Sequence, residues 1–221
     1  MGLTLYWGSG SPFSWRVLLA LEHKRLPYES RLLQFGKQEH QSPPMLKLNP
    51  RGRLPVLTDG DYVVFESLAV LYYLDARYPE RPIFGAGPEE AGVIMRVICE
   101  FQAYAEPSAQ RIVDAVFSGQ VAPGDLATTD AMHTVAREAR TLEARLSKER
   151  WIVGEHYSAA DMVVFPWLQL LLRALGRAGA AELGARFLPL ERNYPALARW
   201  IERIEALPNY AKTYPPHWRD A

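Results

Sequence analysis

Cysteine is almost absent from this sequence, which has a single thiol, Cys99, in 221 residues. One thiol can form neither an intramolecular disulfide nor a Cys-x-x-Cys redox pair, so a disulfide-stabilised scaffold and exchange chemistry at such a pair are excluded. Free cysteines are among the most buried residue types. We therefore expect a cytoplasmic protein in which the Cys99 side chain is part of the core.

An excess of either charge is also lacking, since 25 basic and 25 acidic side chains cancel. A chain without a net field does not attract polyanions such as nucleic acid or an anionic membrane surface. The five histidines are scattered without the spacing of metal ligands. We expect small or neutral partners, with no nucleic acid, no membrane and no bound metal.

Long hydrophobic runs are missing as well. The most apolar stretch, residues 162–172, is shorter than the ~20 residues that cross a bilayer, and it contains Pro166 and Gln169. The first residues show no basic patch followed by an apolar core, so no secretory signal is expected. These features again favour a cytoplasmic protein.

The beginning of the chain predicts alternating strands and helices. Apolar residues alternate over 3–7, which indicates a strand, and apolar residues at helical spacing then run from Ser14 until Pro27 stops them. Alternation over 28–33 indicates a second strand. The expected order is therefore strand, helix, strand.

A hairpin is predicted over residues 56–65, with Asp59-Gly60 at its turn, because glycine supplies the positive φ that a tight turn requires. Ser67 is then expected to cap an apolar helix. This helix is the last element expected before the composition of the chain changes. We assign residues 1–80 to a small α/β unit.

The remainder of the chain predicts helices. Residues 79–88 hold three prolines and two glycines, a composition typical of a connector, and we place a linker at 81–88 and a helical domain at 89–221. A continuous apolar stripe over 132–146 is typical of a packed bundle helix. Pro107 is expected to kink or end the helix before it.

The clearest helix start lies at Ser158, which is followed three residues later by Asp161. This spacing predicts a capping box, in which each side chain bonds the backbone N–H of the other residue. Loss of the cap is expected to cost ~1 kcal/mol. The motif therefore indicates a structural role.

The turn after the first expected strand contains Gly8, Ser9, Gly10 and Ser11. A glycine-rich turn between a strand and a helix often holds phosphate, because the first helical N–H groups are unpaired there. The glycine spacing does not match the dinucleotide fingerprint, and no lysine follows as in a P-loop. Phosphate binding is therefore not expected, and the serines need another role.

Four motifs occur in a characteristic order over nearly the whole chain. They are SPFSWRV at 11–17, EHQSPPMLKLNPRGRLPVL at 39–57, DGDYVVFES at 59–67 and YSAADMVVFPWL at 157–168. With them the chain resembles the cytosolic glutathione S-transferases of the serine type, with phi-, tau- and zeta-like features. The resemblance implies a thioredoxin-like α/β domain followed by an all-α helical bundle, a homodimer, glutathione as co-substrate and a role in detoxification.

The match to SPF implies that the Ser11 hydroxyl donates a hydrogen bond to the glutathione sulfur. A free thiol of pKa ~8.5 is only ~3% ionised at pH 7, and a pKa lowered by ~2 units, worth ~2.7 kcal/mol, would make the thiolate the major form. A hydroxyl donor and the positive end of a helix starting at Ser14 can supply much of this. The alternative is that Ser11 only caps the helix, although Ser14 has the better position for a cap and Ser9 is expected to be a turn residue.

The same matching implies residues that bind the γ-glutamyl and cysteinyl parts of glutathione. Glu66 would pair with the ammonium group, and Ser67 with the N–H groups behind it would receive the carboxylate. Leu54 would pair with the cysteinyl part through its backbone, next to Pro55, which is cis in the family. Phe13 is expected to contact glutathione as well.

The glycyl carboxylate is expected near Arg53, where family members often have lysine or glutamine. Gln41 stands where a lysine is common, and it can donate a hydrogen bond without a charge. Tight binding of this carboxylate therefore depends on compensation by Arg51 or Arg53. His40 is a second candidate donor, with a solvated surface histidine as the alternative.

The expected activity is attack of the glutathione thiolate on an apolar electrophile. Phe13, Tyr104 and Arg111 are expected in the electrophile pocket. One alternative is a glutathione-dependent isomerase of the maleylacetoacetate type, whose paired serine and cysteine are here replaced by Pro12 and Phe13. Another is a non-catalytic protein that binds glutathione or a similar ligand.

Overall fold

The structure is a computed structural model that describes residues 2–121, 125–185 and 187–219. It divides into two compact units, of which the first combines the chain up to Phe84 with the chain from Leu207 onward, and the second spans Gly85–Ala206. The helical domain expected over 89–221 thus ends earlier than the sequence indicated. The final segment belongs to the α/β unit because it packs on the first helix of that unit.

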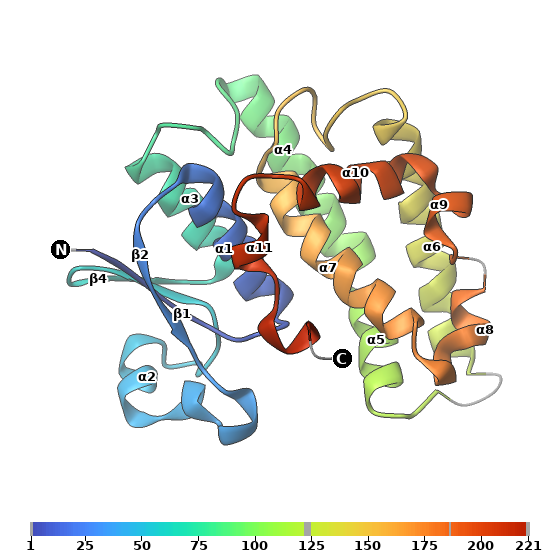
Figure 1. Cartoon of the computed structure of the whole chain (residues 1–221), viewed down its shortest axis with the longest axis horizontal. Coiled ribbons are helices and arrows are strands. Elements are labelled where there is room, and N and C mark those ends of the chain that lie inside the picture. Colours follow the sequence, from blue (N-terminus) through green and yellow to red (C-terminus); the bar gives the residue numbers. More distant parts are fainter. Residues whose placement is uncertain (1, 122–124, 186, 220–221) are drawn as a thin grey trace. The chain divides into compact units, whose positions relative to one another are not determined.

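The first unit is built on a four-stranded mixed sheet in the order β2-β1-β3-β4 (Figure 1). The strands are β1 (Leu3–Trp7), β2 (Tyr28–Leu32), β3 (Val56–Asp59) and β4 (Tyr62–Phe65). β1 pairs parallel with β2 and antiparallel with β3, and β3 and β4 form the predicted antiparallel hairpin. Gly60, with a φ of 60°, begins the two-residue hairpin loop. The expected α/β architecture is confirmed.

Each face of the sheet is covered by helices. Met45 of α2 (Pro43–Leu48) packs with Val56 and Tyr6 on one face. Because side chains alternate along a strand, Leu5 and its partner Leu57 point to the other face, where both are fully buried. The helices α1 (Pro12–Lys24) and α3 (Ser67–Arg77) pack together and supply that second layer. Two short 3₁₀ helices, Phe35–Lys37 and Glu39–Gln41, lead from β2 to α2.

A buried ion pair fixes the end of this unit. Nζ of Lys24 lies 2.7 Å from Oδ1 of Asp75 and also donates to the carbonyls of residues 80 and 81. The Asp75 carboxylate in turn accepts from the N–H groups of residues 83 and 84. All three ammonium donors are used, as burial of a charge requires. The beginning of the expected linker is thereby held against the α/β unit.

His23 next to this ion pair makes the stability of the protein depend on pH. Burial, with the nearby positive charges of Arg81 and Lys24, lowers the pKa of His23 to about 4. Its contribution to stability is complete above the unfolded pKa of about 6.5 and is lost as the pH falls from there towards 4, because only the unfolded chain takes up the proton.

We expect the free energy of unfolding to fall by about 2 kcal/mol more between pH 7 and pH 5 in the parent than in His23→Gln. Urea unfolding at the two pH values measures this difference. Equal losses in the two proteins would show that His23 is not the group that titrates.

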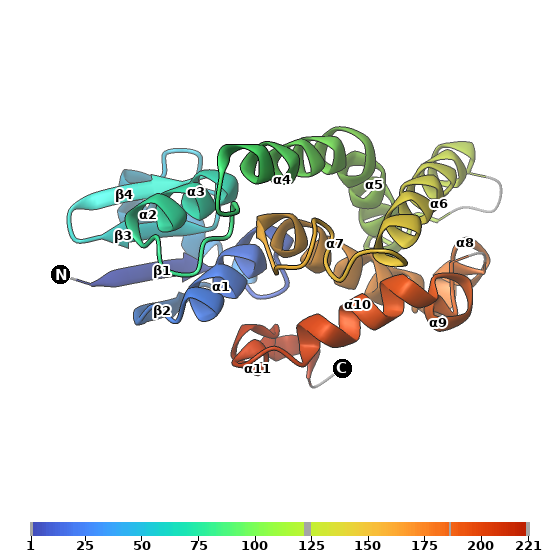
Figure 2. The same cartoon turned by 90° about the horizontal axis from the view of Figure 1, so that it is seen from above.

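The C-terminal segment of the first unit contains α11 (Tyr210–Thr213) and a 3₁₀ turn at Pro216–Trp218. It lies beside α1 in both views (Figures 1 and 2). Nε1 of Trp15 donates to Oγ1 of Thr213 at 3.0 Å, and the rings of Trp15 and Trp218 meet edge to face at 5.4 Å. This buried aromatic contact joins the two ends of the chain.

The second unit contains helices and, among its described residues, no strand. Its helices are α4 (Pro88–Glu100), α5 (Glu106–Phe117), α6 (Leu126–Leu146), α7 (Ala159–Leu175), α8 (Ala181–Gly184), α9 (Leu190–Asn193) and α10 (Pro195–Glu205). The stripe predicted on α6 faces the core, and the capping box at Ser158 and Asp161 begins α7. The prediction of a helical domain is confirmed, although the compact helical unit ends at Ala206.

Pro107 has the predicted effect on the helix before it. A π-helical turn at Phe101–Ala105 separates α4 from α5, and Pro107 lies in the first turn of α5. A proline lacks the N–H of a helix interior and its ring collides with the carbonyl four residues earlier. The wider π turn changes the hydrogen-bond spacing at this place, which accommodates the proline.

Cys99 is exposed on α4, so the expectation of a buried core thiol was wrong. Ile94, Val97 and Ile98 form the buried side of this helix. Cys99 follows them by one residue, which rotates its side chain away from that side because successive residues are about 100° apart. The general preference of cysteine for the core is overridden here by helix position.

Candidate functional site

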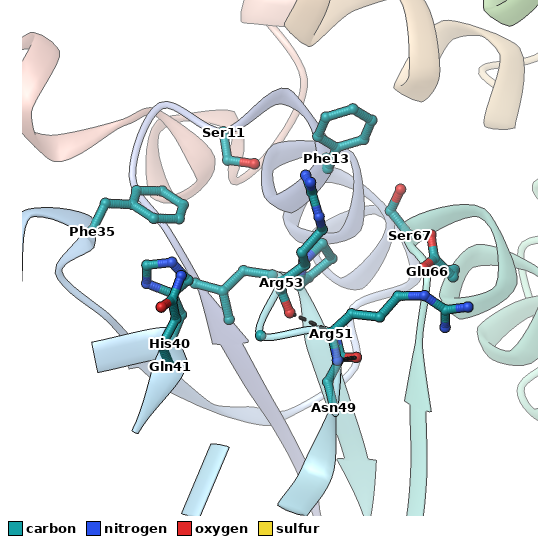
Figure 3. A pocket seen from close by; sticks show the side chains of 13 residues that line it. Ser11, Phe13, Phe35, His40, Gln41, Asn49, Arg51, Arg53, Glu66 and Ser67 are labelled. Atoms are coloured by element: carbon teal, nitrogen blue, oxygen red, sulfur yellow. Dashed lines mark hydrogen bonds between the residues drawn. The ribbon is translucent and has the colours of Figure 1, made fainter. Parts of the chain in front are cut away.

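A cavity of about 570 Å³ lies in the first unit, at the end of the sheet where β1, β2 and β4 end and β3 begins (Figure 3). Its wall comes from the starts of α1 and α3, the two 3₁₀ helices and the loop before β3. The lining residues are Ser11, Phe13, Phe35, His40, Gln41, Asn49, Arg51, Gly52, Arg53, Leu54, Pro55, Glu66 and Ser67. Four segments distant in sequence thus converge on one cavity.

The turn from β1 into α1 brings Ser11 to this cavity. The N–H of Ser11 donates to the carbonyl of Gly8 at 3.3 Å, which closes a four-residue turn. Gly10 has a φ of 78° at the third position of this turn, where a type II turn requires a positive value. Pro12 then occupies the first turn of α1, where its missing N–H costs nothing.

Ser11, not Ser14, is the N-cap of α1, which corrects the expected helix start. The Ser11 backbone is extended, and its Oγ accepts from the N–H of Ser14 at 3.3 Å. Ser14 is fully buried within the first turn, and its own Oγ accepts from the N–H of Gly8 at 3.2 Å. The helix begins earlier than the apolar periodicity indicated because Pro12 has the φ of a first helical residue.

Capping the helix leaves the Ser11 hydroxyl able to act as a donor. A serine hydroxyl has two acceptor lone pairs and one proton, and the cap uses a lone pair. Within the described part of the chain no hydrogen bond from the Ser11 O–H to an acceptor is formed. The site therefore presents a hydroxyl donor at the positive end of α1, where a developing negative charge is stabilised.

Glu66 lies at the start of α3 in a conformation that is rare for a residue other than glycine, with a φ of 67°. Such outliers concentrate at functional sites. Glu66 is the N-cap of α3 and Ser67 is already its first residue, so the expected capping role of Ser67 was wrong. Oγ of Ser67 instead accepts from Nη1 of the buried Arg16 at 3.3 Å. An exposed carboxylate and the open N–H groups of a helix start thus stand side by side.

Asn49 shapes the loop that carries two cavity arginines. Its side chain is buried, with Nδ2 donating to the carbonyl of Arg53 at 2.8 Å and Oδ1 accepting from the N–H of Arg51 at 3.1 Å. The guanidinium groups of both arginines are exposed at the cavity (Figure 3). Leu54 and Pro55 follow, joined by a cis peptide bond. The loop combines fixed backbone with two positive charges.

His40 and Gln41 lie on the opposite side of the cavity, on the second 3₁₀ helix. Nδ1 of His40 is buried and has no hydrogen-bond partner within the described residues. Its ring meets that of Phe35 edge to face at 5.2 Å. His40 is thus a half-buried wall residue rather than the solvated surface histidine that was the alternative.

The structure brings nine predicted site residues together on this cavity, namely Ser11, Phe13, His40, Gln41, Arg53, Leu54, Pro55, Glu66 and Ser67. Tyr104 and Arg111 lie in the second unit, in the π-helical turn and on α5, and both are exposed. The sequence did not point to Phe35, Asn49 and Gly52 as lining residues. A signal for Asn49 was present in the Asn-Pro-Arg-Gly-Arg run, since asparagine side chains often bond backbone groups two residues on.

Two further findings concern the described residues as a whole. They contain no group of three or more His, Cys, Asp or Glu side chains that could hold a metal ion. None of their helices is both long and apolar enough to cross a membrane.

Comparison with family models assigns both halves of the chain. The model described as "Glutathione S-transferase, N-terminal domain" matches residues 1–76, and "Glutathione S-transferase, C-terminal domain" matches residues 114–208. Glutathione S-transferase A of Pleuronectes platessa is 30% identical, over 99% of this chain and 94% of the relative. Glutathione S-transferase 1 of Schizosaccharomyces pombe is 31% identical, over 96% and 94%.

Solved structures show the same architecture. A glutathione S-transferase from the Antarctic clam Laternula elliptica superposes with a TM-score of 0.87 at 28% identity, covering 100% of this chain and 95% of that one. A glutathione transferase from Phanerochaete chrysosporium, solved in complex with oxidized glutathione, has a TM-score of 0.80 at 28% identity and covers 99% and 96%. The similarity therefore extends over both units.

Proposed function

Because the chain belongs to the glutathione S-transferase family, whose members are transferases, we propose that it joins glutathione to an apolar electrophile with Ser11 as the catalytic residue. The observation that carries the proposal is the Ser11 hydroxyl, which caps α1 through a lone pair and keeps its proton for a ligand in the cavity. The relative solved with oxidized glutathione supports the choice of ligand.

Ser11 acts on the thiol and is not itself the nucleophile. Glutathione loses its S–H proton to solvent, and the Ser11 hydroxyl then donates to the thiolate at the N-terminus of α1. The thiolate attacks an electrophilic carbon, a carbon–sulfur bond forms, and the electron pair leaves with the leaving group or is protonated on the product. Holding both reactants in one site contributes much of the rate.

The other cavity residues suit the two charged ends of glutathione. The Glu66 carboxylate would accept from the γ-glutamyl ammonium, and Ser67 with the open N–H groups of α3 would bind the γ-glutamyl carboxylate. Arg51 and Arg53 would pair with the glycyl carboxylate, which compensates for the uncharged Gln41. The presence of a carboxylate and two arginines in one cavity supports this assignment.

Replacement of Asn49 tests whether the two arginines bind the glycyl carboxylate. Asn49 holds the loop that carries them and is not expected to contact the thiol. Asn49→Ala removes two buried hydrogen bonds, each worth about 1 kcal/mol. We expect the Kd for glutathione to rise about fivefold while the pKa of the bound thiol stays unchanged. Isothermal titration calorimetry measures the first quantity and ultraviolet absorbance the second. A shifted thiol pKa at unchanged affinity would contradict the assignment.

The test of the proposed function is the pKa of bound glutathione, measured from the ultraviolet absorbance of the thiolate. We expect a value ~2 units below that of free glutathione in the parent and a return towards the free value in Ser11→Ala. Ser11→Thr is the matched control, because threonine keeps a hydroxyl and is also an accepted N-cap. It should retain most of the shift.

Other outcomes decide between the alternatives. Glutathione that binds without any shift in its thiol pKa would favour a non-catalytic binding protein. A lowered pKa with turnover of maleylacetone, and none of activated chloroarenes, would favour the isomerase. A zeta-class relative from Euphorbia esula is 27% identical, and Pro12 and Phe13 stand in place of the paired serine and cysteine of that type.

The remaining assignments extend the proposal. We propose that Phe13 lines the electrophile pocket, and that the protein is a cytoplasmic homodimer. An exposed, unpaired Cys99 suits a reducing compartment. Light scattering coupled to size-exclusion chromatography tests the dimer, and Phe13→Ala tests the pocket through the KM for the electrophile.

A further inference from the structure

The C-terminal segment 210–219 contacts the very turn that carries Ser11. Oγ of Ser9 lies 2.6 Å from Nδ1 of His217, a hydrogen bond between residues 208 positions apart. The His217 ring also covers Gly10 closely, because a methyl group built there would lie 2.8 Å from its Cε1 atom. Both contacts fall on the residues immediately before the catalytic serine.

The segment that presents His217 has its own attachment to α1. Trp15 donates to Thr213, and its ring meets Tyr214 at 5.9 Å and Trp218 at 5.4 Å, each edge to face. Trp15, Thr213 and Trp218 are buried. His217 therefore approaches the turn from a base that is fixed independently of the Ser9 contact.

The turn itself is weakly restrained by its own bonds. Gly8 and Gly10 give it two residues of high conformational freedom. The hydrogen bond within the turn and the two between the turn and Ser14 measure 3.2 to 3.3 Å, longer than the usual 2.9 to 3.0 Å for an N–H donor. The carbonyl of Ser11 also accepts the first helical bond, from the N–H of Trp15, at 2.9 Å. The 2.6 Å bond between Ser9 and His217 is shorter than any of these. The other end of the chain thus supplies the shortest hydrogen bond to this turn.

We propose that His217 is a positioning residue for thiol activation, which holds the Ser9–Ser11 turn through its hydrogen bond to Ser9 and so aims the Ser11 hydroxyl at the glutathione sulfur. The proposal rests on the proposed function of Ser11. His217 acts through Ser9 and is not one of the residues that line the cavity within the described part of the chain. The C-terminal segment thus supports the glutathione site without lining its cavity.

The experiment compares Ser9→Ala, His217→Ala and the double variant with the parent, using the pKa of bound glutathione as the readout. Loss of one hydrogen bond should raise that pKa by about half a unit to one unit and lower kcat/KM at pH 6.5 about fivefold. The Kd for glutathione should stay within about twofold, because the peptide-binding residues are untouched. The double variant should match either single variant, since all three lack the same bond.

Two controls separate positioning from general loosening. His217→Asn places an amide near the position of Nδ1 and should restore most of the shift in thiol pKa. His133→Ala removes an exposed histidine from α6 and should leave every readout at the parent value. If His217→Ala does not fold, Ser9→Ala decides, because it deletes one hydroxyl in a turn.

Three results would contradict, in turn, the positioning role, the hydrogen bond as its means, and the proposed function itself. An unchanged thiol pKa in Ser9→Ala and His217→Ala, with a raised value in Ser11→Ala, would remove the positioning role and leave the proposed function intact. A change in His217→Ala without one in Ser9→Ala would show that the hydrogen bond is not the means, which also overturns the proposal. A parent that does not lower the thiol pKa would remove both.

Discussion

Replacing Ser11 with alanine is expected to lower kcat/KM towards an activated chloroarene about tenfold at pH 6.5. If the bound thiol titrates ~2 units lower in the parent, roughly half of it is thiolate at this pH, against about 1% in the variant. The more basic thiolate of the variant is intrinsically the better nucleophile, which offsets part of that fiftyfold difference. The loss should therefore be smaller than the change in ionisation alone.

The pH profile identifies the cause of the loss. The rising limb of kcat/KM against pH should move up by ~2 units in Ser11→Ala, and the two proteins should come within a few-fold of each other near pH 9, where both thiols are largely ionised. Steady-state kinetics from pH 6 to 9 measure this, with Ser11→Thr as the control. A loss of equal size at every pH would mean that Ser11 orients glutathione without lowering its pKa.

Replacing Asp161 with alanine is expected to cost on the order of 4 kcal/mol of stability. Its fully buried carboxylate accepts four hydrogen bonds, and burial raises the pKa of this carboxyl group although these donors act in the opposite direction. Oδ1 accepts from the N–H of Ile152 and from Nε1 of Trp200, and Oδ2 accepts from the N–H and Oγ of Ser158. Without the carboxylate, four donors lose their acceptor in the interior.

Urea or thermal unfolding of three variants tests this account. Asp161→Asn keeps the volume and one acceptor oxygen but turns an NH₂ group towards two of the donors, so its loss should be smaller than that of Asp161→Ala. Asp125→Ala is the matched control, because Asp125 also caps a helix, α6, but is partly exposed. Its loss should be far smaller. Similar losses at Asp161 and Asp125 would reduce Asp161 to an ordinary helix cap.

The capping box illustrates how far local sequence signals reach. The three-residue spacing of Ser158 and Asp161 was enough to predict the start of α7. It gave no indication of Trp200, which lies 39 positions away in the chain and donates to the same carboxylate. The expected cost of losing the motif, ~1 kcal/mol for a cap, is therefore too small for this residue.

The serine-containing turn shows the opposite limit, a local signal that was misread. Apolar periodicity begins at Ser14, and a cap was expected there, but periodicity reports only which residues face the core. Pro12 already has helical φ, so α1 starts at it and Ser11 becomes the cap. The same kind of error moved the cap of α3 from Glu66 to Ser67, because no local rule predicts a glutamate with positive φ.

By itself the sequence determined the local features of this protein. The alternation in β1 and β2, the hairpin around Gly60, the stripe on α6 and the family motifs each depend on residues close together in the chain. Only the tertiary structure decided that Trp200 donates to Asp161 and that His217 meets Ser9. These contacts depend on how distant segments pack, and a side chain acquires such a partner only after the sheet and helices have closed around it.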